Sequence, residues 1–249
     1  MTAEKPWVFL FDLDGVLTPT VDLHIRAWQE TFDEVFAAHD REPFTLSDYH
    51  NCLDGRARFD GVQTLLQARG IDLPWGSADD SGIATVCGIG NEKNRHFQEV
   101  LTRDGIAPYP GSAQLLRKAK AAGIAMAVVS SSRNAPGVLA AAKLTEFFQA
   151  VVDGNVAAAL QLPGKPHPDT FLHAATLLGS TPETAVVFED AVSGVQAGAA
   201  GNFAHVVGVD RGAGTAALNA AGAHTVVSDL AEFETLDQLT QNLTGNHQW

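Results

Sequence analysis

The amino-acid sequence predicts an α/β protein in which a parallel sheet, covered by helices, is interrupted by an inserted helical domain. From residue 106 onwards, short and nearly continuous apolar runs alternate with helix-like segments, a pattern typical of strands buried on both faces. One further apolar run, 7–12, stands alone near the N-terminus and is followed by a long segment with helical periodicity and no strand-like run. We therefore expect the first strand to be separated from its partners by the insert.

The order of elements follows from this pattern. Strands are expected at 7–12, 124–132, 150–154, 185–190, 203–209 and 224–229. The core helices are expected at 112–122, 134–143, 168–178, 191–200 and 212–222, and those of the insert at 22–38, 56–69 and 91–104. The hinge-like stretches "TPT" (18–20) and "APYPG" (107–111) flank the insert. The sequence thus predicts a core domain of 1–19 with 108–249 and a helical domain of 20–107.

Composition excludes several classes of partner. A net charge of −13 leaves too few basic residues for a general nucleic-acid or anionic-membrane surface. No apolar run approaches the roughly 20 residues that a membrane helix needs. The two cysteines, Cys52 and Cys87, make neither a disulfide framework nor a metal-ligand spacing. We expect a cytoplasmic protein that binds neither nucleic acid nor membrane; a monomer is the simplest expectation, and an oligomer is left open.

Polar side chains fall where the strands of the core should end. They are Asp12, Asp14, Ser130, Lys165, Glu189 and Asp190. A parallel sheet brings such positions to one edge, where ligands bind. Several carboxylates can hold one Mg²⁺, which offsets their repulsion, and a lysine with a hydroxyl can hold a phosphate beside it. Each residue alone is more typical of a turn or a helix cap, so the weight lies in the whole set in this order.

Four motifs in this order resemble those of one enzyme superfamily: "FDLDGVLT", "VVSSS", "GKPHPD" and "FEDAVSG". The chain is similar over nearly its whole length to haloacid dehalogenase (HAD) superfamily phosphotransferases, in the β-phosphoglucomutase-like group. The resemblance implies a Rossmann-like HAD fold with an inserted helical cap. It also implies Mg²⁺ as cofactor and a small phosphorylated substrate, such as a sugar phosphate.

The resemblance assigns roles to the strand-end residues. It implies that Asp12 attacks phosphorus to form an aspartyl-phosphate, and that Asp14 acts as general acid and base. Ser130 and Lys165 would hold the transferring phosphoryl group. The implied metal ligands are the Asp12 carboxylate, the Asp14 backbone carbonyl, Glu189 and Asp190. The residues after Ser130 join the expected substrate site: Ser131, Ser132, Arg133 and Asn134.

The insert supplies further matches. "TVDLHIRAW" resembles the mutase pattern, and "LDGRARFDG" (53–61) resembles its specificity loop, in which Arg58 would grip a distal phosphate. Asp54 stands where the well-studied mutases have lysine, which reverses a charge in that loop. The expected substrate-binding residues of the insert are Thr20, His24, Trp28, Gly55, Arg58 and Lys93.

The sequence leaves the reaction open between two outcomes. Water meeting the aspartyl-phosphate gives a phosphatase, whereas a sugar phosphate rebound in the other orientation gives a β-phosphoglucomutase-type isomerase. Asp54 favours the hydrolase by a small margin. A phospho-receiver domain or a non-catalytic binding protein ranks far lower, because the chain carries a cap and the complete set of motif residues.

Overall fold

The computed structural model describes residues 6–240. The described residues divide into two compact units, one formed by 6–19 with 107–240 and the other by Thr20–Ile106. We refer to them as the core unit and the inserted unit. Each has an apolar cluster of its own, so each is described by itself.

The core unit is built on a six-stranded parallel sheet with strand order β3-β2-β1-β4-β5-β6. The strands are β1 (Val8–Phe11), β2 (Ala125–Val129), β3 (Ala150–Val152), β4 (Ala185–Glu189), β5 (His205–Val209) and β6 (Thr225–Val227). The first strand lies inside the sheet, with Phe11 level with Val128 of β2 and Phe188 of β4. This register brings the residues that follow β1, β2 and β4 to one edge.

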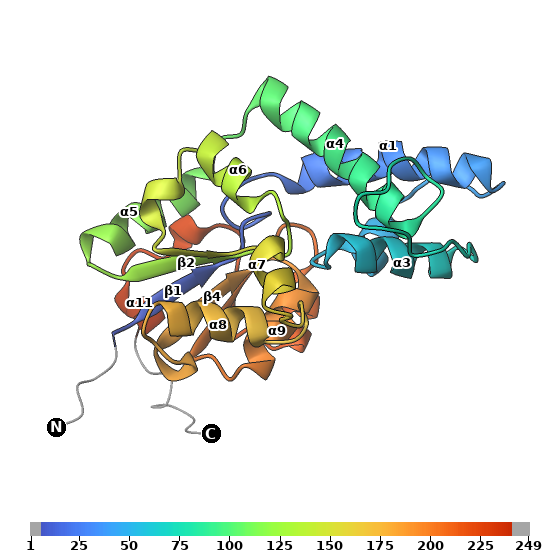
Figure 1. The fold of residues 1–249 in the computed structure, drawn as a ribbon. Coiled ribbons are helices and arrows are strands. Elements are labelled where there is room, and N and C mark those ends of the chain that lie inside the picture. The colour runs from blue at the N-terminus through green and yellow to red at the C-terminus, as the bar shows by residue number, and fades with distance from the viewer. Residues whose placement is uncertain (1–5, 241–249) are drawn as a thin grey trace. The chain divides into compact units, whose positions relative to one another are not determined.

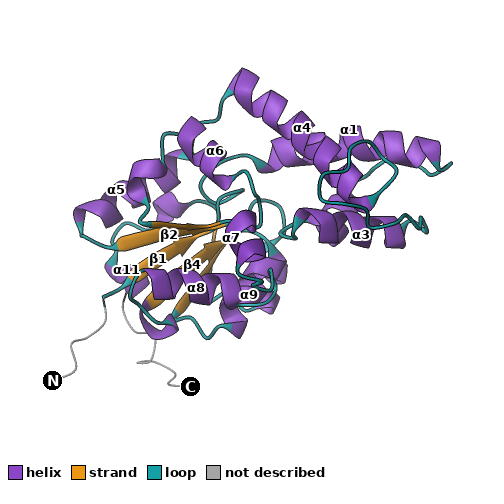
Figure 2. Cartoon of the chain, viewed as in Figure 1, coloured by secondary structure: helices purple, strands orange, loops and turns teal. Residues whose placement is uncertain are grey.

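Helices cover both faces of the sheet (Figures 1 and 2), as a fully buried parallel sheet requires. They are α5 (Pro110–Ala121), α6 (Ala135–Ala141), α7 (Gly154–Ala159), α8 (Asp169–Leu177), α9 (Val192–Ala200), α10 (Thr215–Ala221) and α11 (Asp237–Thr240). Single 3₁₀ turns lie at η2 (Thr145–Phe147), η3 (Pro182–Thr184) and η4 (Leu230–Glu232).

Successive side chains of β1 point to opposite faces of the sheet, so this strand contributes to the apolar packing on both faces. Val8 and Leu10 belong to the cluster that contains Phe171 of α8. Phe9 and Phe11 face the other way, and the Phe11 ring stacks on Phe188 with centroids 4.4 Å apart.

The inserted unit is helical, as predicted for this part of the chain. It contains α1 (Val21–Ala38), α2 (Leu46–Asp48), the π-helical turn η1 (Tyr49–Leu53), α3 (Arg58–Ala68) and α4 (Val86–Asp104). Both α1 and α3 pack on α4. Among the described helices of the whole chain, none combines the length and the apolar composition that crossing a membrane requires.

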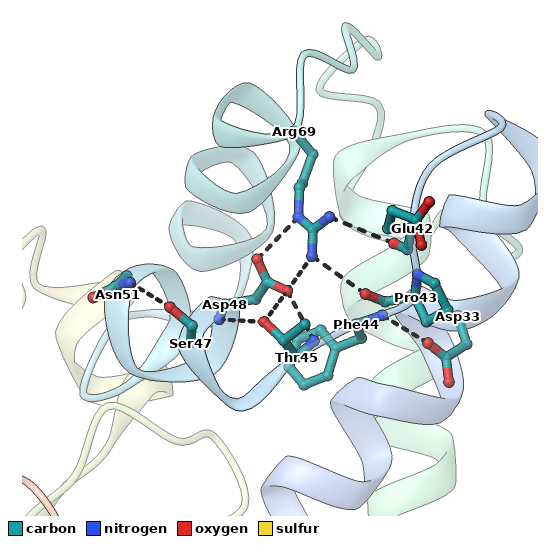
Figure 3. A network of polar contacts seen from close by, with 9 residues as sticks. All are labelled: Asp33, Glu42, Pro43, Phe44, Thr45, Ser47, Asp48, Asn51 and Arg69. Atoms are coloured by element: carbon teal, nitrogen blue, oxygen red, sulfur yellow. Dashed lines mark hydrogen bonds and ion pairs between the residues drawn. The ribbon is translucent and has the colours of Figure 1, made fainter.

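Figure 3 shows the polar network that fixes the short helix α2 within this unit. Thr45 and Asp48 form a reciprocal capping box, in which each side chain accepts from the other residue's backbone N–H. Arg69, at the end of α3, donates from Nε to Asp48 Oδ1 at 2.9 Å and also pairs with Asp48 Oδ2. Its Nη1 donates to the Glu42 carbonyl at 3.5 Å, and Nη2, which also pairs with Asp48 Oδ2, donates to the Pro43 carbonyl at 3.3 Å. The network ties α2 to the end of α3.

Two helices of the insert differ from the predicted boundaries. The helix expected at 91–104 begins at Val86, because Thr85 caps it by accepting a hydrogen bond from the Gly88 N–H at 3.0 Å. The helix expected at 56–69 begins at Arg58. The turn η1 was not predicted, because its sequence "YHNCL" has no apolar periodicity that would indicate a helix.

Candidate active site

Lys165 joins the ends of three strands in the core unit. Its Nζ donates to Asp12 Oδ1 and to Glu189 Oε1, both at 2.5 Å, and to the Val129 carbonyl at 3.1 Å. These partners lie at the ends of β1, β4 and β2, so one ammonium group spans the middle of the sheet edge. The lysine side chain is only 2% exposed, and Glu189 only 1%. The predicted convergence of Asp12, Lys165 and Glu189 is therefore present in the geometry.

Burial and charge act together on this cluster. Burial raises the pKa of Asp12 well above its ordinary value; Lys165 opposes this shift, and the carboxylates of Glu189 and Asp14 add to it. Burial also disfavours the charge on Lys165, but the contacts with Asp12 and Glu189 outweigh it and raise the pKa of the lysine. The lysine is thus held as a cation, and the raised pKa of Asp12 indicates that this one ammonium does not offset burial and the neighbouring acids.

Asp14 and Asp190 complete the sheet edge. Ser130 Oγ lies 3.5 Å from Asp14 Oδ2, at the outer limit of a hydrogen bond. A methyl group placed on Gly15 would come within 1.9 Å of Asp190 Oδ2, so the Asp190 carboxylate lies directly against the turn that follows Asp14. Gly15 has a φ of +88°, which further favours glycine there. The turn after β1 and the residue after β4 therefore meet.

The donor set at this edge fits a divalent cation. The Asp190 carboxylate lies against the Asp14–Gly15 turn, and carboxylate and carbonyl oxygens are the donors that Mg²⁺ prefers. Within residues 6–240, no three His, Cys, Asp or Glu side chains are gathered as a metal cluster.

Glu189 has a different position from the one expected of a metal ligand. One of its oxygens accepts from Lys165, and the other accepts from the Ala191 N–H at 2.9 Å. A methyl group on Gly194 of α9 would overlap the carboxylate at 1.8 Å, so the helix packs directly on it. This geometry assigns Glu189 to holding the lysine.

The residues after Ser130 form a compact turn. Ser130 Oγ accepts from the Ser132 N–H, and Ser132 Oγ accepts from the Asn134 N–H, both at 3.1 Å. The Arg133 carbonyl accepts from Asn155 Nδ2 at 3.2 Å. The sequence analysis did not single out Asn155, although its place beside the helix-capping Asp153 marks it as a loop-fixing residue. Ser131 lies in the same turn, where its carbonyl approaches Gly154.

In the inserted unit, three of the predicted residues form one aromatic-lined cluster. Lys93 is only 4% exposed, and its Nζ lies 5.0 Å from the Trp28 ring and 4.9 Å from the Phe97 ring. The same ammonium contacts His24 Nδ1, and His24 stacks on Phe97 with centroids 4.2 Å apart. Thr20, fully buried, immediately precedes the helix that carries His24 and Trp28.

Arg58 begins α3 and lies against α4. Its Nη2 donates to Asn94 Oδ1 at 2.8 Å, and its Nη1 lies 3.4 Å from Asn91 Oδ1. A methyl group on Gly90 would approach Arg58 Cδ at 3.1 Å, so this glycine permits the close contact. Gly55, with a φ of +69°, makes the turn before the helix. Asn91 and Gly90 were missed from the sequence, because their role depends on which helix faces them.

The fold and the strand-end cluster together define a phosphoryl-transfer enzyme of the HAD type. Residues 8–202 match the haloacid dehalogenase-like hydrolase family, and the chain belongs to that family. This confirms the superfamily and the α/β fold inferred from the four motifs.

Relatives narrow the placement within the family. The chain is 49% identical over 241 residues to a β-phosphoglucomutase of Mycobacterium tuberculosis, covering 92% of each protein. It is 33% identical over 207 residues to the β-phosphoglucomutase of Bacillus subtilis, covering 82% of this chain and 83% of that one. A crystal structure of Rhodobacter sphaeroides CbbY in complex with xylulose-1,5-bisphosphate matches with a TM-score of 0.74 and 25% identity, covering 95% of this chain and 100% of that one. The β-phosphoglucomutase-like group expected from the motifs is thus confirmed.

Proposed function

We propose that this protein transfers a phosphoryl group between positions of a small sugar phosphate, in the manner of a β-phosphoglucomutase. The observation that carries the proposal is the junction of Asp12, Lys165 and Glu189 at the edge of the sheet. It supports the proposal because Lys165 holds one oxygen of the Asp12 carboxylate, so the other oxygen would be available to attack a phosphate. The near-half identity to a mycobacterial β-phosphoglucomutase supports isomerisation over the hydrolysis that Asp54 favoured.

The residues of the core unit divide the chemistry among them. Asp12 would attack phosphorus through the carboxylate oxygen that Lys165 does not hold, forming an aspartyl-phosphate. Asp14 would give a proton to the departing sugar oxygen and take one from the incoming hydroxyl. Lys165 and Ser130 would balance the charge of the transferring group, with Glu189 fixing the lysine.

A magnesium ion is the proposed cofactor. The Asp12 and Asp190 carboxylates and the Asp14 backbone carbonyl would hold it. When bound, it would neutralise the surplus acids and polarise the phosphoryl oxygens. Glu189, placed among the ligands by the sequence, is proposed instead as a positioning residue.

The inserted unit would supply selectivity. Arg58, fixed by Asn94, offers a planar guanidinium for the distal phosphate of a sugar bisphosphate. The other substrate-binding residues proposed for the inserted unit are Lys93, His24, Trp28, Thr20 and Gly55. Those proposed for the core unit are Ser131, Ser132, Arg133 and Asn134.

The proposal is tested by supplying β-glucose 1-phosphate, Mg²⁺ and a catalytic amount of the matching bisphosphate. We expect glucose 6-phosphate to form at least about tenfold faster than free phosphate, which corresponds to a lower activation free energy for isomerisation than for hydrolysis. The D12N variant should form neither product, whereas D237N, which changes an exposed acid on α11, should behave as the wild type. Free phosphate without isomer would assign the protein to the phosphatases.

A further inference from the structure

Arg211 joins three loops at the edge of the core sheet. Its Nε donates to the Gly15 carbonyl at 3.0 Å, and its Nη1 donates to the Ser228 carbonyl at 2.8 Å. Its Nη2 lies 3.4 Å from Asp229 Oδ2. These partners follow β1 and β6, whereas Arg211 follows β5. One guanidinium therefore ties the turn that carries Asp14 to the far half of the sheet.

The flat face of the same guanidinium is also occupied. Its central carbon lies 3.9 Å from the centroid of the Tyr109 ring. Tyr109 in turn donates its backbone N–H to the Leu17 carbonyl at 2.9 Å, and Ser112 Oγ donates to the Val16 carbonyl at 2.6 Å. The segment after β1 is thus supported along its length, with Arg211 acting at the position nearest to Asp14.

The Gly15 peptide is held from several sides. Its N–H donates to the Thr18 carbonyl at 2.8 Å, its carbonyl accepts from Arg211, and its Cα touches the Asp190 carboxylate. Gly15 adopts a positive φ and, as glycine, resists rotation of its backbone least of all residues. The hydrogen bond from Arg211 therefore adds an anchor from outside the turn to the backbone bonds within it.

We propose that Arg211 is a positioning residue for the reaction, which fixes the Asp14–Gly15 peptide so that the Asp14 side chain and backbone carbonyl are correctly placed. The inference rests on the proposed function, because it gives Asp14 its proton-transfer and metal-binding roles. Lysine cannot replace the arginine fully, since an ammonium has no fork of donors for two separate carbonyls and no plane to lie on Tyr109. A misplacement of about 1 Å in a catalytic group lowers the rate on the order of 100-fold, so the loss of this contact should lower kcat.

Lys118→Met is the matched control for the R211M variant. Lys118 supports the same region after β6, because its Nζ donates to the carbonyls of Phe233 and Glu234 at 3.1 Å and 3.0 Å. Both of these carbonyls lie outside the Asp14–Gly15 turn. A loss caused only by loosening residues 228–234 would therefore appear in both variants.

The experiment measures kcat and KM for isomerisation. It also measures the affinity of each purified protein for Mn²⁺ alone by calorimetry. We expect R211M to lower kcat at least about tenfold relative to K118M, with KM within about threefold, and to weaken Mn²⁺ binding several-fold. R211K should recover part of the lost kcat. If R211M does not fold, R211K tests the inference in its place, and its kcat should be at least about threefold below that of K118M.

The inference fails if R211M, or R211K in its place, matches K118M in kcat and in Mn²⁺ affinity. That result is distinct from failure of the proposed function, which would appear as full activity in D12N or as no turnover of sugar phosphates by the wild type. Mn²⁺ binding gives an answer even when the substrate is wrong, because it needs no turnover.

Discussion

At the residue scale, the buried acids of the core depend on Lys165. An unpaired carboxylate in such a place is costly, and the lysine offsets that cost for Asp12 and Glu189 at once. Asp12 remains short of positive charge, as the rise in its pKa through burial and the neighbouring acids indicates. The lysine offsets part of the repulsion between the two aspartates that follow the first strand, and the proposed cation would offset the rest.

The different tasks of Glu189 and Asp190 can be separated by amide variants. E189Q should lower kcat about tenfold because Lys165 loses one of its anionic partners, while Mg²⁺ affinity stays within about threefold. D190N should weaken Mg²⁺ binding at least about tenfold, because it removes an anionic ligand. Calorimetry with Mg²⁺ alone measures both affinities. Equal weakening in the two variants would return Glu189 to the metal ligands.

Arg58 is expected to act on the distal phosphate alone. R58A should raise KM for a sugar bisphosphate by at least about tenfold, the equivalent of one hydrogen bond to a charged group. It should alter KM for a monophosphate by no more than about threefold. R56A, which changes a neighbouring arginine in the same loop, is the control. Equal effects of R58A on both substrates would remove Arg58 from recognition of the second phosphate.

At the scale of elements, the strands and the long helices were predictable and the local turns were not. A nearly continuous apolar run predicted each strand of the sheet. The start of α4 was misplaced because Asn91 and Glu92 interrupt its apolar pattern, and the cap at Thr85 lies before a glycine-containing stretch. Asn91 fixes the preceding loop instead, by donating to the carbonyls of Ala78 and Asp80, both at 2.9 Å. Tertiary contacts of this kind leave no periodic signal.

The Asp48–Arg69 pair of Figure 3 should make the inserted unit sensitive to acid. Burial opposes ionisation of Asp48, but hydrogen bonds from Arg69 and Thr45 outweigh it and lower the pKa of the folded-state carboxyl. The unfolded chain, with a pKa of about 3.9, then binds more protons in the acidic range. The stability from this pair is present above about pH 4 and is lost as the pH falls through the lower folded-state value.

D48N removes this contribution. It should lower the free energy of unfolding at pH 7 by about 1.5–3 kcal/mol, the range for a hydrogen bond to a charged group, and the difference from the wild type should shrink below pH 4. Denaturant unfolding at several pH values measures it. D104N, in the solvent-exposed Arg103–Asp104 pair, is the control and should leave the unfolding midpoint unchanged. A loss in D48N that is the same at pH 3 and pH 7 would contradict the account.

At the scale of the whole molecule, the alternation of strands and helices predicted a parallel sheet whose strand ends share one edge. The first strand pairs with β2 and β4, so residues that lie far apart in the sequence share one edge. What the sequence could not supply is the partition of roles at that edge. Whether Glu189 faces a metal or a lysine depends on the contact of α9 through Gly194, and the role of Arg211 depends on three loops meeting. The net charge of −13 argued against a general nucleic-acid surface but carried no information about the local fields at this edge.

The central claim is that a lysine-held carboxylate at residue 12, beside a cation site, captures a phosphoryl group. Its most direct measurement is the position of the covalent phosphate during turnover. The wild-type protein is mixed with substrate and Mg²⁺, denatured in acid, treated with borohydride to reduce an acyl-phosphate to the alcohol, and mapped by mass spectrometry. The account predicts homoserine at position 12, formed only when Mg²⁺ is present. Substrate turnover with an unmodified Asp12, or with the modification at another residue, would contradict it.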